Sequence, residues 1–80
     1  MDRAELEARL EVARIRRDAY SLDGGLPNET LVLGKGAAGQ WEVYYSERGL
    51  KTGLRVFGSE AEATQFFLER ILDDPTARRE

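Results

Sequence analysis

Hydrophobic and polar residues alternate along the middle of the chain in the pattern of β-strands. In the segment 40–57, apolar or aromatic side chains occupy every second position, first at Trp41, Val43 and Tyr45 and then at Leu54 and Val56. A period of two is typical of a strand with one buried face. The intervening residues 46–53 include two glycines and three charges, which predicts a hairpin loop. We therefore expect two antiparallel strands here, with aromatic side chains at the core.

A third strand precedes this pair. The segment 29–34 alternates leucines with Thr30 and Val32, which predicts a strand. The glycine-rich segment 35–39 lacks the Gly-Lys-Ser/Thr ending of a P-loop, and a strand rather than a helix follows it. We interpret 35–39 as a hairpin loop and not as a phosphate site.

Two further segments show the spacing of amphipathic helices. In 2–14, two leucines lie one turn apart, and Asp2 is placed to cap the first turn. In 59–74, Ser59 begins a capping box, and a broad apolar stripe follows until Pro75 ends the helix. Both helices are expected to bury one face.

The connector between the first helix and the first strand contains two turn signals. These are Asp23-Gly24-Gly25 and Pro27-Asn28. Ahead of them, Tyr20 and Leu22 alternate as in a short extended segment. Buried anchors are the favoured interpretation of these two residues, and a ligand-contacting loop is the alternative.

The order helix, strand, strand, strand, helix predicts an α+β domain. We expect two layers, in which two helices cover one face of a three-stranded antiparallel sheet. Residues 1–75 would form this single domain, and 76–80 a flexible C-terminal tail. The other sheet face would be open to solvent or to a partner, and it would carry Thr30, Val32, Glu42, Tyr44, Arg55 and Phe57. Val32, Tyr44 and Phe57 would form an apolar patch of the kind that marks interfaces with other proteins. Self-association through this face is the alternative.

The composition narrows the possible chemistry. The 80 residues have a net charge of −3 and contain neither cysteine nor histidine. The chain therefore lacks the side chains for disulfides and thiolate metal sites, and it lacks the commonest general base and zinc ligand. We expect no catalytic residue, no metal site and no cofactor. A small enzyme or a ligand carrier is kept as a third hypothesis.

The N-terminus and the hydropathy bear on localisation. The opening residues Met-Asp-Arg-Ala-Glu-Leu are charged from the second position, unlike a secretory signal. No run approaches the roughly 18 apolar residues of a membrane helix. We expect a soluble cytoplasmic protein that is a monomer or a weak homodimer.

The acidic excess lies at the C-terminal end of the chain. Residues 59–80 hold six acids and three bases, whereas the preceding residues are balanced. An acidic helix disfavours a phosphate backbone and favours a basic protein partner. Three arginines at 14, 16 and 17 suggest a nucleic-acid patch, but Glu7, Glu11 and Asp18 are placed to compensate them.

A cluster of aromatic and charged residues is predicted to form a contact surface. Tyrosine and arginine are enriched at interface hot spots, and complementary charges steer association. The candidate partner-binding residues are Tyr44, Tyr45, Glu47, Arg48, Phe57, Glu60 and Glu62. The alternative is that the outward tyrosine covers the second face of the sheet. Trp41 is a further candidate anchor, although burial in the core is its favoured role.

Two resemblances follow from these segments. The element order, with Gly-Ser-Glu-Ala-Glu-Ala opening the last helix, resembles the double-stranded RNA-binding domain. That family places lysines at the head of the second helix to hold phosphates, whereas this chain has Glu60 and Glu62. Nucleic-acid binding as an accessory domain is therefore the second hypothesis, and fold likeness does not transfer the activity.

The second resemblance covers residues 18–75. The strings Asp-Ala-Tyr-Ser-Leu-Asp-Gly-Gly, Trp-Glu-Val-Tyr-Tyr-Ser-Glu-Arg-Gly and Phe-Gly-Ser-Glu-Ala-Glu-Ala look like small actinobacterial immunity-type proteins encoded beside polymorphic toxins. The resemblance implies a protein-binding module that occludes a cognate toxin enzyme, for example a basic toxin domain. This antitoxin-like inhibitor is the leading hypothesis.

Overall fold

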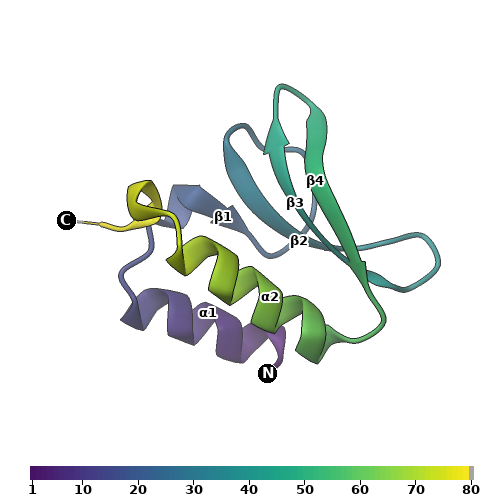
Figure 1. The fold of residues 1–80 in the computed structure, drawn as a ribbon, viewed down its shortest axis with the longest axis horizontal. Helices are drawn as coiled ribbons and strands as arrows, with labels where there is room; N and C mark the ends of the chain where they lie inside the picture. The colour runs from purple at the N-terminus through teal and green to yellow at the C-terminus, as the bar shows by residue number, and fades with distance from the viewer. Residues whose placement is uncertain (80) are drawn as a thin grey trace.

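The computed structural model describes residues 1–79, which form two helices and a four-stranded sheet (Figure 1). The elements in chain order are α1 (Arg3–Val12), η1 (Arg17–Ala19), β1 (Tyr20–Ser21), β2 (Thr30–Lys35), β3 (Trp41–Glu47), β4 (Leu50–Phe57), α2 (Glu60–Leu72) and η2 (Pro75–Ala77). The α+β class and the two helices are confirmed. The sheet is larger than the predicted three strands because β1 adds a fourth.

The strand order in the sheet is β1-β2-β3-β4. The three long strands form the predicted antiparallel meander, and β1 pairs in parallel with β2 through Tyr20 opposite Leu31. A sequence pattern of only two strand residues is too short to identify such a pairing. β1 and β4 are thus the two edge strands, of two and eight residues.

Side-chain caps fix the starts of both helices as predicted. The Asp2 carboxylate accepts a hydrogen bond from the Glu5 N–H at 2.8 Å, and the Ser59 hydroxyl accepts one from the Glu62 N–H at 3.2 Å. These bonds satisfy backbone donors that the first helical turn leaves free. α1 lies beside α2, and the backbone N–H of Arg3 joins them by donating to Glu60 at 2.9 Å.

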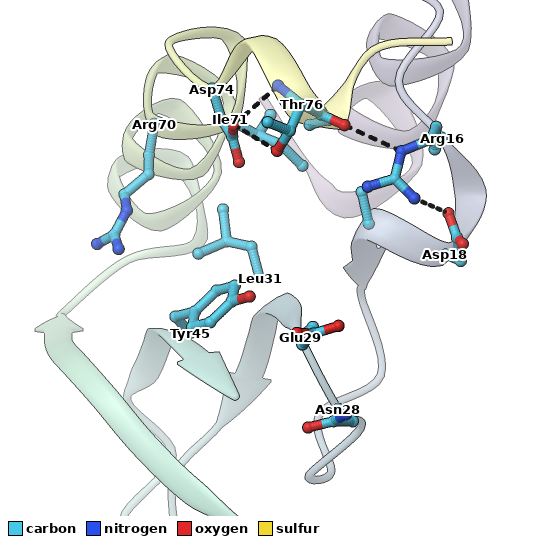
Figure 2. Close-up of a pocket in the computed structure, with 12 residues that line it drawn as sticks. Arg16, Asp18, Asn28, Glu29, Leu31, Tyr45, Arg70, Ile71, Asp74 and Thr76 are labelled. Atoms are coloured by element: carbon cyan, nitrogen blue, oxygen red, sulfur yellow. Dashed lines mark hydrogen bonds and ion pairs between the residues drawn. The ribbon is translucent and has the colours of Figure 1, made fainter. Parts of the chain in front are cut away.

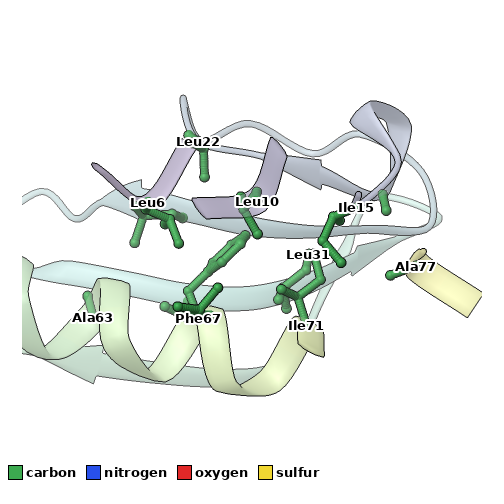
Figure 3. Close-up of a cluster of buried hydrophobic side chains, with 13 residues drawn as sticks. Leu6, Leu10, Ile15, Leu22, Leu31, Ala63, Phe67, Ile71 and Ala77 are labelled. Carbon is green, nitrogen blue, oxygen red and sulfur yellow. The ribbon is translucent and has the colours of Figure 1, made fainter. Parts of the chain in front are cut away.

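One hydrophobic core lies between the helices and one face of the sheet, here called the helix face (Figure 3). α2 packs against β2, β3 and β4, and α1 supplies Leu6 and Leu10. Phe67 of α2 is fully buried at the centre of this cluster. The periodic apolar residues of both helices therefore occupy the predicted buried positions.

On the opposite face of the sheet, here called the loop face, the connector 22–29 covers parts of β2 and β3. The Tyr44 hydroxyl donates a 2.7 Å hydrogen bond to the Gly25 carbonyl oxygen. The chain also passes so close to β2 that a Cβ on Gly34 would lie 3.3 Å from the Cα of Gly24. Val32 and Tyr44 are buried under this connector, although neither belongs to the core against the helices. β2 is consequently buried on both faces.

The turn between β3 and β4 is shorter than expected. Glu47 pairs with Leu50, so only Arg48 and Gly49 form the loop, in place of the predicted 46–53. Both have positive φ, 53° and 78°, the combination that a type I′ hairpin turn requires. The polar residues Lys51 and Thr52 belong to β4, where they pair with Ser46 and Tyr45 of β3.

Residues 76–79 pack against the rest of the domain, whereas a flexible tail was predicted for 76–80. The backbone N–H of Arg16 donates to the Ala77 carbonyl at 2.7 Å, and the N–H of Arg79 donates to Arg14 at 2.6 Å. Ala77 is buried in the core, and Ile15 and Arg78 form an isolated β-bridge. The C-terminal segment thus pairs with the residues that follow α1.

Candidate functional site

The residues predicted for partner binding do not form one surface. Tyr44 is 3% exposed and held by its bond to Gly25, so the expectation that it faces outward is wrong. The alternation along β3 was interpreted correctly, but the sequence did not predict that 22–29 would cover this face. With Val32 also buried, the predicted apolar patch does not exist.

Phe57 and Arg55 lie on the helix face and not on the loop face. Phe57 is opposite Trp41, and its ring centroid is 5.2 Å from that of Phe66 on α2. The Arg55 guanidinium also lies over the Phe66 ring, at 5.5 Å. The assumed faces of β4 were therefore inverted. Phe57 is half-buried there and packs against the core.

The charged candidates occupy separate places. Glu47 and Arg48 lie at the hairpin turn with their charged atoms 4.0 Å apart. Glu60 and Glu62 both take part in local contacts at the head of α2: Glu60 accepts from the Arg3 N–H, and Glu62 accepts from the Ser59 hydroxyl at 3.1 Å. Tyr45 is on the helix face, half-buried against the core.

β4 is the most exposed strand of the sheet. Residues 50–56 are all exposed, including Leu50, Leu54 at 46% and Val56 at 55%. β4 pairs with β3 alone, and within residues 1–79 no other backbone segment hydrogen-bonds to its outer side. A long edge strand with exposed apolar side chains is a template for pairing with another chain.

A β-bulge divides β4 and sets the direction of its side chains. Val43 pairs with Arg55 and Tyr45 with Thr52, so Gly53 and Leu54 together face Tyr44. Gly53 has a φ of 65°, which a glycine adopts at little cost. Because Val56 is opposite Glu42 on the loop face, Leu54, two residues away, shares that face.

A cavity of about 420 Å³ lies between η1, the start of β2 and the junction of α2 with η2 (Figure 2). Half of its polar side chains contact other residues of the lining. Arg16 lies 2.7 Å from the Asp18 carboxylate and donates to the Thr76 carbonyl at 3.0 Å, while Asp74 accepts from the N–H and the hydroxyl of Thr76. These bonds attach the C-terminal segment to η1, and we interpret the cavity as structural.

Tyr45 lines this cavity. Burial raises the pKa of its hydroxyl above the usual 10.0, and the carboxylates of Glu29, Glu47 and Asp74 raise it further because they disfavour a second negative charge. Burial likewise raises the pKa of Tyr20, with Glu11 as the next cause. A phenol in this environment keeps its proton at neutral pH, which disfavours a role as a base.

The arginines after α1 are mostly engaged within the protein. Arg17 pairs with Glu11, and Arg16 with Asp18, as the sequence predicted. Within residues 1–79, no acidic side chains come together in a way that could hold a metal ion. Neither helix of the described chain has the length and apolar composition of a membrane-spanning segment.

Comparisons with family models, with curated proteins and with solved structures found no match for this chain. The exposed β4 edge is the candidate site that the geometry offers. The alternation of Leu54 and Val56 predicted a buried face for these two residues, whereas both are exposed. The signal available was the composition of 50–57, which holds two cations, a glycine and no acid.

Proposed function

We propose that this protein is a protein-binding module whose partner adds an extended segment to the outer edge of β4. The observation that carries the proposal is an eight-residue edge strand whose residues 50–56 are all exposed and whose outer side is unpaired within residues 1–79. Strand addition uses main-chain hydrogen bonds for affinity and alternate side chains for specificity.

The occupant is another protein rather than a second copy of this chain. The charged residues of β4 are Lys51 and Arg55, both cations, so two antiparallel β4 strands that pair Leu54 with Val56 would place one Arg55 opposite the other. Edge cations and bulges are the devices by which proteins prevent pairing with their own copies. The bulge at Gly53 and these two cations fit that role.

The finer proposal is that binding inhibits a partner enzyme, as the resemblance to immunity-type proteins implies. A rigid β-sheet covered by helices on one face provides a scaffold on which an added strand would be held in place. The experiment is to capture partners from the source organism and to assay the enzymatic activity of the captured protein with and without this domain. A catalytic partner whose activity is unchanged by saturating domain would contradict inhibition.

The β4 edge itself is tested by variants in the same capture. Leu54→Lys with Val56→Lys places two further cations on exposed positions, and capture should fall by more than tenfold. The matched control is Val12→Lys on α1, where an exposed valine lies away from the sheet. Equal capture by all three proteins, or loss in the control alone, would overturn the assignment of the site to β4. Recovery of nucleic acid in place of protein would favour the second hypothesis.

A further inference from the structure

The half of β4 that follows the bulge has a defined pattern of side chains. Arg55 and Phe57 lie on the helix face, and Leu54 and Val56 on the loop face. Leu54 and Val56 are beyond the cover of the connector 22–29, which contacts Tyr44 on the neighbouring strand. A strand added at this half would therefore meet two exposed apolar side chains on one face and a guanidinium between them on the other.

The two cations of β4 differ in how far they are neutralised. The Lys51 ammonium lies 3.4 Å from the Glu42 carboxylate and 4.7 Å from the centroid of the Tyr44 ring. The Arg55 guanidinium lies over Phe66 and, within residues 1–79, has no carboxylate within ion-pair distance. Arg55 is thus the charge on this edge that a partner could complement.

Self-pairing is disfavoured by the register that would bury the apolar residues. If Leu54 of one copy were opposite Val56 of another in an antiparallel pair, Arg55 would be directly opposite Arg55. Like charges directly opposite each other destabilise a strand pair, whereas opposite charges contribute roughly 0.2–1 kcal/mol. The same register with an acidic residue in place of the second arginine removes the conflict.

We propose that the partner strand carries the pattern apolar–acidic–apolar, with its acidic residue beside Arg55 and its apolar residues against Leu54 and Val56. The inference rests on the proposed function and specifies the chemistry of the partner. The acidic side chain would lie on the helix face, and the apolar side chains would extend the loop face beyond β4. The strand would pair along residues 54–57, because the bulge at Gly53 interrupts the regular pleat there.

The test measures the binding of two strand-forming peptides to the 80-residue chain. One peptide has a glutamate between two valines at its centre, and the other has a lysine in place of that glutamate. Binding is followed by NMR chemical shifts of residues 50–57. The wild-type protein should bind the glutamate peptide about fivefold more tightly, in line with one opposite-charge cross-strand pair. The preference should shrink as salt is raised.

Charge exchange at Arg55 makes the test specific. Arg55→Glu should reverse the preference so that the lysine peptide binds more tightly, and Arg55→Gln should leave the two peptides nearly equal. Both variants lose the contact with Phe66, so their unfolding midpoints are measured to show that they fold. Equal binding of both peptides by the wild-type protein, no binding of either, or a preference that Arg55→Glu does not reverse would overturn the proposal.

The two proposals fail in different ways. A protein partner whose capture depends on Leu54 and Val56, but whose added strand has no acidic residue beside Arg55, would overturn the apolar–acidic–apolar pattern and leave β4 as the binding site. If the glutamate peptide binds more tightly but the β4 variants capture the protein partner as well as the wild type does, the charge complementarity at Arg55 is retained and the proposed function is overturned.

Discussion

β2 and β4 lie on either side of β3 in one sheet, and their surroundings are opposite. Residues 30–34 of β2 are all buried, because the helices cover one face and the connector 22–29 covers the other. Residues 50–56 of β4 are all exposed, although the strand is two residues longer. The region around β2 is therefore covered on both faces of the sheet, whereas residues 50–56 at the β4 edge are exposed.

The comparison shows that exposure of β4 follows from chain connectivity. The connector that covers the loop face is attached to β1 and β2, and its contact with Tyr44 marks its reach into β3. Beyond β4 no element of residues 1–79 adds to the sheet. The stability of the domain should depend on the buried residues around β2, and partner binding should depend on the exposed residues of β4.

The largest expected effect is at Tyr44, on the covered loop face. Tyr44→Ala should destabilise the fold by about 3–5 kcal/mol, as removal of a buried aromatic ring does. Urea unfolding measures this change. Tyr44→Phe keeps the ring and removes the bond to the Gly25 carbonyl, so it should cost only about 1 kcal/mol. A loss under about 1 kcal/mol for Tyr44→Ala would show that the connector does not bury this ring.

The next largest effect is expected at Val32, which lies on the same face of the sheet as the exposed Val56. Val32 is fully buried in β2, and Val32→Ala should cost about 2 kcal/mol, because it removes two methyl groups from a packed site. The free energy of unfolding in urea is the measurement. A wild-type value for Val32→Ala would contradict the double cover of β2.

A smaller effect concerns the pH dependence of stability at Tyr45. Its pKa is raised in the folded protein, so the protonated hydroxyl stabilises the fold fully below the unfolded pKa of about 10. This contribution is lost as pH rises through the folded pKa. Tyr45→Phe should therefore reduce the loss of stability above about pH 10, as measured by urea midpoints on both sides of that pH. Identical pH profiles for the two proteins would contradict the raised pKa.

The smallest effect on stability is expected at the open edge. Val56→Ala should change the free energy of unfolding by less than about 0.5 kcal/mol, because Val56 is exposed and packs against nothing that folding requires. The same substitution should weaken capture of the protein partner. If Val56→Ala destabilised the fold as much as Val32→Ala, the contrast between a buried β2 and an exposed β4 would be wrong.

Local sequence signals predicted most of the fold. The caps at Asp2 and Ser59, the apolar stripe through Phe67 and the alternation in β2 and β3 are set by neighbouring residues, and all were found in the structure. The short extended segment expected at Tyr20 and Leu22 was not assigned to the sheet, because the two residues of β1 form a strand only by pairing with β2. Such a pairing is a long-range property that no local pattern specifies.

The candidate site was harder to predict for the same reason. Whether Tyr44 is exposed depends on its contact with the connector, where the Gly25 carbonyl, nineteen positions away in the sequence, accepts a hydrogen bond from the Tyr44 hydroxyl. The faces of Arg55 and Leu54 depend on a bulge at Gly53, which shifts the register by one residue and cannot be distinguished from a loop glycine in the sequence. The exposed edge is therefore visible only once the strand order is known.

Amide hydrogen exchange of the domain with and without its captured partner tests the central claim most directly. Strand addition makes main-chain hydrogen bonds, so outward amides of β4 should exchange more slowly in the complex, while those of α1 should keep their rates. Protection centred on residues 54–57 is the result predicted here. Protection confined to α1, to η1 or to the cavity lined by Tyr45, with β4 unchanged, would contradict the assignment of the binding site to this edge.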